Sequence, residues 1–247
     1  MVAVLAGLAV AGGSCRGGTE EGEAETGRLV SPSEPILYVA VGASESVGMG
    51  ADRPLDQAWP VVLHRRALPP GSELVNLGVP GATVADALRT QLPAALARRP
   101  GLVTVWLNVN DILRGVPAAA YERQLGDLVH ALRRGGATLV LVANTPAFEL
   151  LPVYQSSRAA GAGSPGYPAP GAGLTSPAGL DDVVAAYNRV IERVTRREGA
   201  VMVDLHGAGL AALEAGTAAS FVGADGFHPS TAGHRAVAEL FAAALGR

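Results

Sequence analysis

The sequence predicts an α/β fold with a five-stranded parallel sheet covered by helices on both faces. Short continuous apolar runs, which are typical of strands buried on both faces, alternate with longer stretches of helical periodicity. No segment repeats at a fixed period, and this alternation favours a parallel sheet with crossover helices. The length of 247 residues with 49% hydrophobic residues is enough for one large core.

The strands and helices are assigned from these two patterns in chain order. Each predicted strand is a run that we expect to be fully buried, and these runs are 36–41, 73–77, 102–107, 137–143 and 200–205. The predicted helices are 56–68, 84–97, 117–134, 180–198 and 231–245. In the last helix Val237, Leu240, Phe241 and Leu245 share one face.

Composition narrows the chemistry that this chain can perform. A net charge of -3 gives no basic surface for nucleic acid, so we expect no nucleic-acid partner. The absence of Lys excludes a Schiff-base lysine and the lysine of a phosphate-binding loop, and the single Cys15 excludes intrachain disulfides and thiolate-rich metal clusters. Ser, His, Asp, Glu, Asn and the backbone remain. We attribute the abundance of Ala, Gly and Arg to biased composition and not to function.

The first 35 residues differ from the rest of the chain. Residues 1–15 form an uncharged apolar stretch ending at Cys15, which resembles a signal segment and is too short to span a bilayer. If this is a lipoprotein signal, Cys15 is the lipidated residue and tethers the protein to a membrane. Residues 16–35 are acidic and rich in small residues, as in a flexible linker, and residues 36–247 form the folded domain. We therefore expect an exported, extracytoplasmic protein.

Polar residues follow the predicted strands, where ligands bind in parallel α/β sheets. Read singly, Ser44 could be a helix cap and Asp225 a helix start. Together they supply an acyl-transfer site: Ser44 as nucleophile, His228 as its base, and Asp225, three residues earlier, to orient the imidazole. Backbone N–H groups of Ser44 and Gly81 and the amide of Asn110 would form the oxyanion hole.

These motifs resemble those of the SGNH hydrolase superfamily, also called GDSL-type esterases and lipases. Gly42-Ala43-Ser44 is similar to the family's Gly-Asp-Ser block, Gly81 to the second-block glycine, Asn110-Asp111 to the third block and Asp225-Gly-Phe-His228 to the final Asp-x-x-His. The resemblance covers most of residues 36–245. It implies a flavodoxin-like three-layer α/β/α fold and ester hydrolysis without metal or other cofactor. It also implies catalysis by the five residues assigned above.

The chain departs from the family pattern at two positions. Ala43 replaces the usual Asp beside the nucleophile, and Asn108 replaces the usual Gly two residues before Asn110. We expect the first change to alter hydrogen bonding around Ser44, with Glu45 as a candidate for compensation. The second is expected to reshape the oxyanion pocket.

Other residues offer rival assignments. Ser46 is a second candidate nucleophile, but neither serine lies in a Gly-x-Ser-x-Gly elbow. Asp204 and His206 are expected to serve packing and helix capping, and His234 to be structural or exposed. These side chains lack the spacing of a known metal motif, so no metal site is predicted.

Two functions remain open. The first is a serine esterase acting through an acyl-enzyme on a small-molecule, lipid or glycan ester, with short to medium acyl chains favoured. The second is a weakly active or inert extracytoplasmic module that binds a glycan or lipid, suggested by the changes at Ala43 and Asn108. The apolar stretch 148–154 is either an acyl-pocket wall or a loop anchor, and the long small-residue connection 144–179 is either a lid or filler. We expect a monomer.

Overall fold

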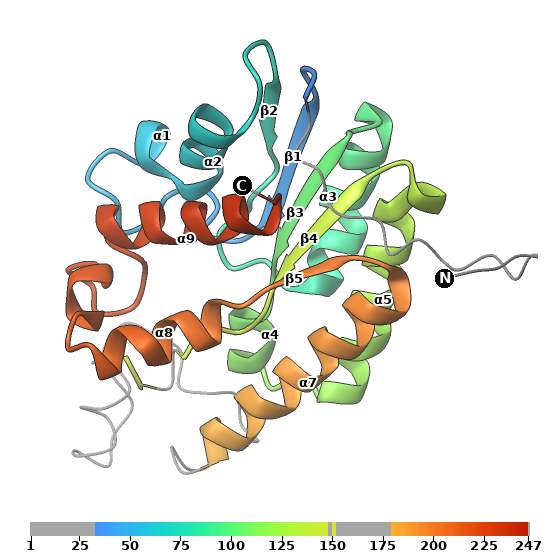
Figure 1. The fold of residues 1–247 in the computed structure, drawn as a ribbon. Helices are drawn as coiled ribbons and strands as arrows, with labels where there is room; N and C mark the ends of the chain where they lie inside the picture. Colours follow the sequence, from blue (N-terminus) through green and yellow to red (C-terminus); the bar gives the residue numbers. More distant parts are fainter. Residues whose placement is uncertain (1–32, 148–149, 152–178, 247) are drawn as a thin grey trace, which may run out of the picture.

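The fold is a parallel sheet between two helical layers. The computed structural model describes residues 33–147, 150–151 and 179–246. In this part of the chain five parallel strands pair in the order β2-β1-β3-β4-β5 (Figure 1). The strands are β1 (Leu37–Gly42), β2 (Glu73–Asn76), β3 (Leu102–Trp106), β4 (Leu139–Ala143) and β5 (Val201–Val203).

Helices cover both faces of this sheet. One face carries α1 (Pro54–Gln57), α2 (Trp59–Ala67) and α9 (Thr231–Ala244). The opposite face carries α3 (Val84–Arg98), α5 (Ala118–Arg133) and α7 (Leu180–Glu198). The remaining short elements are α4 (Val109–Leu113), η1 (Arg134–Gly136), α8 (Leu205–Glu214) and η4 (Ala218–Phe221). The predicted three-layer α/β/α architecture is confirmed.

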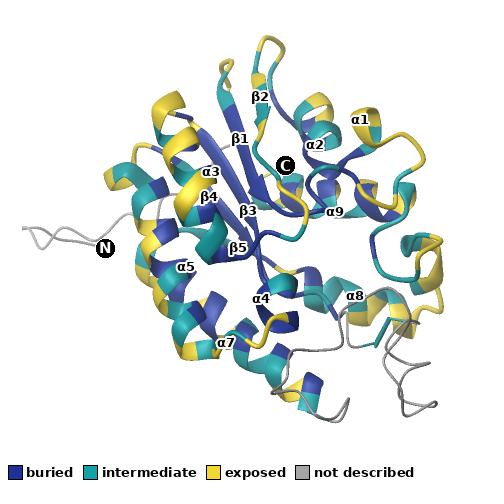
Figure 2. Cartoon of the chain, turned by 180° about the vertical axis from the view of Figure 1, so that it is seen from behind, coloured by how far each residue is buried: buried dark blue, intermediate teal, exposed yellow. Residues whose placement is uncertain are grey.

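Each face of the sheet has its own apolar core. On the α2 and α9 side, the rings of Trp59 and Phe241 stack with their centroids 4.3 Å apart. On the other side, Tyr121 and Tyr187 stack at 4.2 Å between α5 and α7. The central strands are buried and the outer helix surfaces exposed (Figure 2). The sheet is therefore a rigid platform, and the loops at its carboxyl edge are free to carry polar groups.

Three details of the expected fold are wrong. The run 73–77 is not a fully buried strand, because β2 is the sheet edge, and both Glu73 and Asn76 at its ends are exposed. The helix expected over 56–68 is two helices, because Ala58 is extended with ψ 137° and Pro60 stands in the first turn of α2. The strand expected over 200–205 ends at Val203, since Asp204 caps the next helix, and it is not fully buried, because β5 is the other edge of the sheet.

The expected signal-like segment 1–15 lies outside the described residues, as does the linker 16–35 up to residue 32. Most of the connection 144–179 also lies outside them, with residues 144–147, 150–151 and 179 described. Within the described part of the chain, no helix is both long and apolar enough to cross a membrane.

Candidate active site

The turn after β1 presents Ser44 at the carboxyl edge of the sheet. The side chain of Gln91, buried in α3, anchors the strand end by accepting from Gly42 N–H at 2.9 Å and donating to Gly42 C=O at 3.0 Å. The chain then turns sharply, with Ser46 N–H donating to Ala43 C=O at 3.2 Å. The Ser44 side chain is consequently held in one place and is only 8% exposed.

His228 and Asp225 lie against Ser44 from the segment that precedes α9. His228 Nε2 is 3.0 Å from Ser44 Oγ, and His228 Nδ1 is 2.6 Å from Asp225 Oδ2. Because a carboxylate only accepts hydrogen bonds, Nδ1 carries the hydrogen, and neutral Nε2 accepts from the Ser44 hydroxyl. The predicted trio is thus joined in one hydrogen-bonded chain, an arrangement that can remove the hydroxyl proton during attack.

The backbone fixes the carboxylate of Asp225. Its Oδ1 accepts from the N–H groups of Phe227 at 2.9 Å and His228 at 3.0 Å. Burial raises the pKa of Asp225, but the hydrogen bonds from the His228 side chain and from these two N–H groups outweigh burial and lower it. The carboxyl therefore stays ionised and holds the imidazole in one orientation.

The segment that carries His228 is locked to the loop after Ser44. Gly50 has φ +89°, and a Cβ there would lie 2.4 Å from the carbonyl oxygen of Pro229 and 2.9 Å from His228 Cβ. Only glycine allows this close approach. On the other side, Gly223 N–H donates to His228 C=O at 2.8 Å.

Gly81 and Asn110 come from neighbouring connections, after β2 and β3. Gly81 has φ +77°, a backbone conformation that favours glycine, which explains why a glycine occupies this turn. Asn110 lies in α4 and donates through Nδ2 to Ala82 C=O at 3.1 Å. A side-chain amide has two N–H donors, so this bond positions Asn110 beside the Gly81 turn and leaves one donor for a ligand.

Two further side chains, to which the sequence analysis assigned no role, strengthen the connection between α4 and the Gly81 turn. Asp111 is fully buried, and both of its carboxyl oxygens accept from Val84 N–H at the start of α3, at 3.2 and 3.1 Å. Arg114 donates to Gly81 C=O at 2.7 Å and pairs with Asp86 at 3.3 Å. The segment formed by α4 and Arg114 therefore fixes the Gly81 turn and the start of α3 by several hydrogen bonds. In the sequence, only the Asn110-Asp111 motif indicated that this segment belongs to the site.

Burial raises the pKa of Asp111 to about 7, and the neighbouring Asp86 carboxylate acts in the same direction. The hydrogen bond from Val84 N–H and the charge of Arg114 oppose this rise without cancelling it. Asp111 is therefore a buried acid that changes charge near neutral pH.

The two departures from the family pattern have separate structural outcomes. Ala43 is 1% exposed and packs in the apolar core, so no carboxylate occupies that position. Asn108 is also buried, and its Nδ2 donates to Ala143 C=O at 3.3 Å, which ties the end of β3 to the end of β4. Its side chain thus links the carboxyl ends of two neighbouring strands.

Glu45 is buried beside Ser44, with 8% exposure, and its Oε2 has no hydrogen-bond partner among the described residues. Burial raises the pKa of Glu45, while its own backbone N–H, the positive charge that His228 carries when protonated and the Ser44 hydroxyl lower it to a smaller extent. The sequence analysis considered Glu45 only as a candidate to compensate for the missing Asp at position 43, and did not predict that its carboxyl group adjoins both Ser44 and His228.

The rival residues have structural roles. Ser46 is fully buried, and its backbone C=O accepts from Asn76. Asp204 caps α8 by accepting from Gly207 N–H at 2.8 Å, as expected from helix capping. His234 is buried, bonded through Nδ1 to Trp59 N–H at 3.3 Å and through Nε2 to Met49 C=O at 3.0 Å. In the described ranges, no three His, Cys, Asp or Glu side chains are grouped so that they could hold a metal ion.

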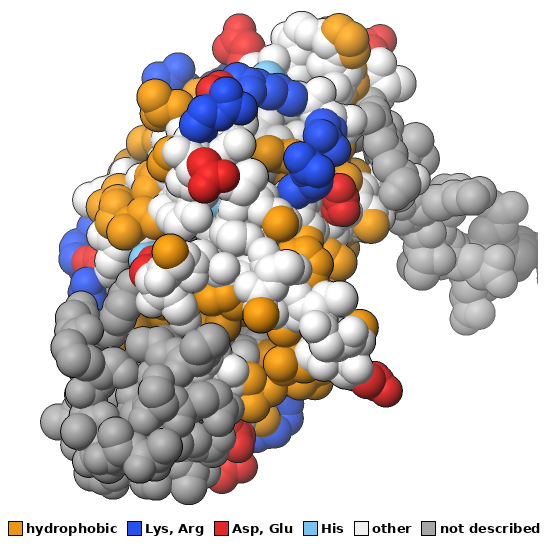
Figure 3. Space-filling view, turned by 90° about the vertical axis from the view of Figure 1, so that its left-hand side faces the viewer, with side chains coloured by type: hydrophobic (Ala, Val, Ile, Leu, Met, Phe, Trp, Pro, Cys, Tyr) orange, Lys and Arg blue, Asp and Glu red, His pale blue; other side chains and the backbone are white. Residues whose placement is uncertain are grey.

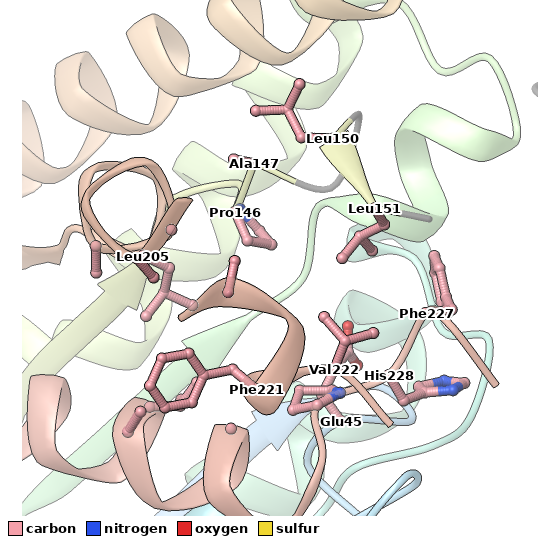
Figure 4. A pocket seen from close by; sticks show the side chains of 18 of the residues that line it. Glu45, Pro146, Ala147, Leu150, Leu151, Leu205, Phe221, Val222, Phe227 and His228 are labelled. Carbon is pink, nitrogen blue, oxygen red and sulfur yellow. The ribbon is translucent and has the colours of Figure 1, made fainter. Parts of the chain in front are cut away.

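An apolar pocket of about 350 Å³ opens beside His228. Figure 4 shows Pro146, Ala147, Leu150 and Leu151 of the connection after β4 above it, with Phe227, His228, Val222 and Glu45 at one end. Many further lining residues are small or aliphatic: Ala208, Gly209, Ala212 and Leu213 of α8, Ala218 and Ala219 of η4, and Gly233, Ala236, Val237 and Leu240 of α9. In the space-filling view of this side, hydrophobic and uncharged side chains occupy the middle of the face (Figure 3).

This pocket has the size and apolar lining of a ligand site. Leu150 and Leu151 belong to the stretch 148–154 that was predicted either to line an acyl pocket or to anchor a loop, and these two residues line the pocket. Residues 148–149 and 152–154 lie outside the described residues.

Comparison with known proteins identifies the class. Residues 40–236 match the GDSL-like Lipase/Acylhydrolase family, and the chain belongs to that family. It is 28% identical to Esterase TesA of Pseudomonas aeruginosa, over 83% of this chain and 85% of that protein. It is also 29% identical to an arylesterase of Vibrio mimicus, over 44% of this chain and 54% of the relative.

Solved structures of similar proteins have the same fold. The crystal structure of TesA superposes with a TM-score of 0.60 at 26% identity, covering 85% of this chain and 97% of that one. A lipase/acylhydrolase from Enterococcus faecalis has the same fold, with a TM-score of 0.63 at 20% identity, covering 84% of this chain and 93% of that one. The protein described here is a GDSL-type carboxylic ester hydrolase, as its motifs predicted.

Proposed function

We propose that the protein hydrolyses esters of short to medium acyl chains through a Ser44-His228-Asp225 triad. The observation that carries this proposal is the continuous hydrogen-bonded chain from Ser44 Oγ through the imidazole to Asp225. Ser44 Oγ attacks the ester carbonyl while His228 Nε2 takes its proton. His228 then protonates the leaving alcohol as the C–O bond breaks and an acyl-enzyme remains. Water then attacks the acyl-enzyme while His228 takes its proton, and His228 returns a proton to Ser44 Oγ as the bond between the acyl carbon and Oγ breaks and the acid leaves.

The oxyanion of each tetrahedral intermediate needs donors already in place. In this proposal they are the backbone N–H groups of Ser44 and Gly81 and the second N–H of the Asn110 amide. The contacts of Asn110 with Ala82 and of Arg114 with Gly81 support it, because they hold two of these donors in a fixed relation.

The acyl chain is placed in the apolar pocket beside His228. Burial of each methylene contributes about 0.8 kcal/mol, which corresponds to about a fourfold gain in kcat/KM if the chain is equally buried in the transition state. The pocket volume of about 350 Å³ supports medium chains over acetyl groups as the preferred substrates. The natural substrate then carries its acyl chain as part of a lipid, glycan or small-molecule ester.

The test compares p-nitrophenyl acetate, butyrate and octanoate hydrolysis by the full chain with that by Ser44→Ala and His228→Ala. We expect activity in the wild type only, with Ser46→Ala as the matched serine control that retains it. A fluorophosphonate probe should label wild type and Ser46→Ala, but not Ser44→Ala. Folded wild type that neither hydrolyses these esters nor takes the label would instead support the glycan- or lipid-binding module.

We also propose that the protein is exported and tethered through a lipid on Cys15, supported by the apolar stretch before that residue. Expressed in a bacterium fed radiolabelled palmitate, the full chain should become labelled and fractionate with membranes, whereas Cys15→Ser should not. Equal labelling of the two would refute the tether. We further propose a monomer, and light scattering of the purified protein tests it.

A further inference from the structure

The pocket beside His228 contains a carboxyl group that its apolar lining does not explain. Every described lining residue is aliphatic, aromatic, Gly or Pro, except Glu45 and His228. The Glu45 carboxyl is hydrogen-bonded to its own backbone N–H and to the Ser44 hydroxyl, but its Oε2 has no hydrogen-bond partner among the described residues. An unpaired buried carboxyl oxygen costs free energy. The mechanism proposed above uses His228 and leaves Glu45 without a role.

Two residues that line the pocket each have a polar atom without a partner. Glu45 Oε2 and Trp106 Nε1 are both buried, and neither has a hydrogen bond within the described structure. Glu45 is 8% and Trp106 3% exposed, so water does not satisfy either side chain from bulk solvent. Their chemistry is complementary, because an indole N–H only donates whereas a carboxyl oxygen accepts, and when protonated also donates.

The position of Glu45 limits where its ligand group can be. It follows Ser44 directly in the chain, and in Figure 4 it lies with Val222 and His228 at one end of the pocket. A group bound by Glu45 is therefore close to the ester carbonyl and not at the far end of the acyl chain. The terminal torsion of a Glu side chain is soft, so a small rotation turns Oε2 toward a ligand in the pocket.

We infer that Glu45 selects esters whose acyl chain carries a hydroxyl group on the second or third carbon. A hydroxyl both donates and accepts, so it pairs with a carboxyl in either protonation state and can also accept from Trp106 Nε1. The rest of the chain packs against the apolar wall. This inference rests on the proposed function, because it assumes that the acyl part of the substrate occupies this pocket.

Burial, which raises the pKa of Glu45, is consistent with this role. A neutral carboxyl is less costly in an apolar pocket than a carboxylate, and it offers the ligand an O–H donor as well as an acceptor.

The test measures kcat/KM for ethyl hexanoate and for its 2-hydroxy and 3-hydroxy derivatives by pH-stat titration. We expect the wild type to prefer one hydroxyester by about tenfold, the effect of one buried hydrogen bond. Glu45→Leu should reduce this ratio to about one and raise kcat/KM for ethyl hexanoate, whereas Glu45→Gln, which still hydrogen-bonds, should keep part of the preference. Trp106→Phe should lower the ratio to a smaller extent. Glu239→Gln, at an exposed position of α9, is the matched control and should keep the wild-type ratio.

An unchanged ratio in Glu45→Leu would overturn the inference. An equal loss of kcat for all three esters would do so as well, since it would mean that Glu45 acts on Ser44 or His228 and not on the acyl chain. To separate this outcome from failure of the proposed function, binding of hexanamide, 2-hydroxyhexanamide and 3-hydroxyhexanamide is measured by calorimetry. A Glu45-dependent preference for either hydroxyamide in a protein inert toward esters would refute only the proposed chemistry, and absence of that preference would refute the selectivity.

Discussion

Replacing Asp111 by Asn should change how the stability of the protein depends on pH. Asp111 is fully buried against the start of α3 and beside Tyr121 and Tyr187, and its pKa is raised from the ordinary 3.8 to about 7. In the unfolded chain the carboxyl regains its ordinary pKa. Between these two values the folded protein therefore holds a proton that the unfolded chain has released, and stability falls as pH rises.

The size of this effect follows from the pKa difference. The rise from 3.8 to about 7 is about three units, and each unit corresponds to about 1.36 kcal/mol. Below pH 3.8 both states are protonated and Asp111 costs nothing, whereas above about pH 7 its ionisation costs the folded state about 4 kcal/mol. Asn cannot ionise, and its Oδ1 can still accept from Val84 N–H, so Asp111→Asn removes the pH-dependent cost while keeping the link to α3.

The assay is urea unfolding of wild type and Asp111→Asn at several values from about pH 4 to about pH 8. The difference in free energy of unfolding should shift in favour of the variant by about 4 kcal/mol over this range. Subtracting wild type cancels the other titrating groups. Asp127→Asn, at an exposed position of α5, is the matched control and should give a flat difference. A flat difference for Asp111→Asn as well would refute the reasoning that burial dominates the pKa of this acid.

Three further changes test the site. Asn110→Ala should lower kcat by about 100- to 1000-fold with little change in KM, because one oxyanion donor is lost, and equal kcat values would argue against that role. Asp225→Asn should lower kcat by about 10⁴-fold, since an amide permits the wrong imidazole tautomer, and a loss below about tenfold would contradict the assignment. From the pocket volume we expect the wild type to prefer octanoate over butyrate, and Ala212→Phe should fill the acyl pocket and abolish this preference, measured with p-nitrophenyl esters. An unchanged chain-length preference would show that the acyl chain does not bind in this pocket.

The elements with strong periodicity were the predictable part of the fold. Helix α7 covers residues 180–198 as expected, because its apolar residues keep one face along the whole stretch. Helix α8 was missed, since Gly207 and Gly209 weaken its helical signal and it follows β5 after the single residue Asp204. Helix α4 was not predicted, because five residues are too few to show a period.

The catalytic motifs could be recognised because their chemistry is tied to short sequence patterns. The residues that surround and position the catalytic side chains could not be predicted in this way. Asp111 accepts from Val84 N–H at the start of α3, and Arg114 donates to Gly81 C=O. Both hydrogen bonds join segments about 30 residues apart, and nothing in local sequence specifies such a pairing. The same holds for the burial of Glu45 beside Ser44, because the pocket that it lines is completed by residues of α8, η4 and α9, far along the chain.

The small residues around the pocket have a structural effect that composition alone did not indicate. The many Ala and Gly residues were attributed to compositional bias, yet Ala208, Gly209 and Ala212 of α8 line the pocket together with Ala218 and Ala219. Larger side chains at these positions would occupy space that is now open, because a buried Leu or Phe fills volume that Ala leaves free. Gly209, one of the two glycines that made α8 hard to predict, is thus also one of the small residues that leave the cavity next to His228 open. In this protein the small side chains are a structural cause of the pocket, so substrate preference should respond to single substitutions among them without any change to Ser44, His228 or Asp225.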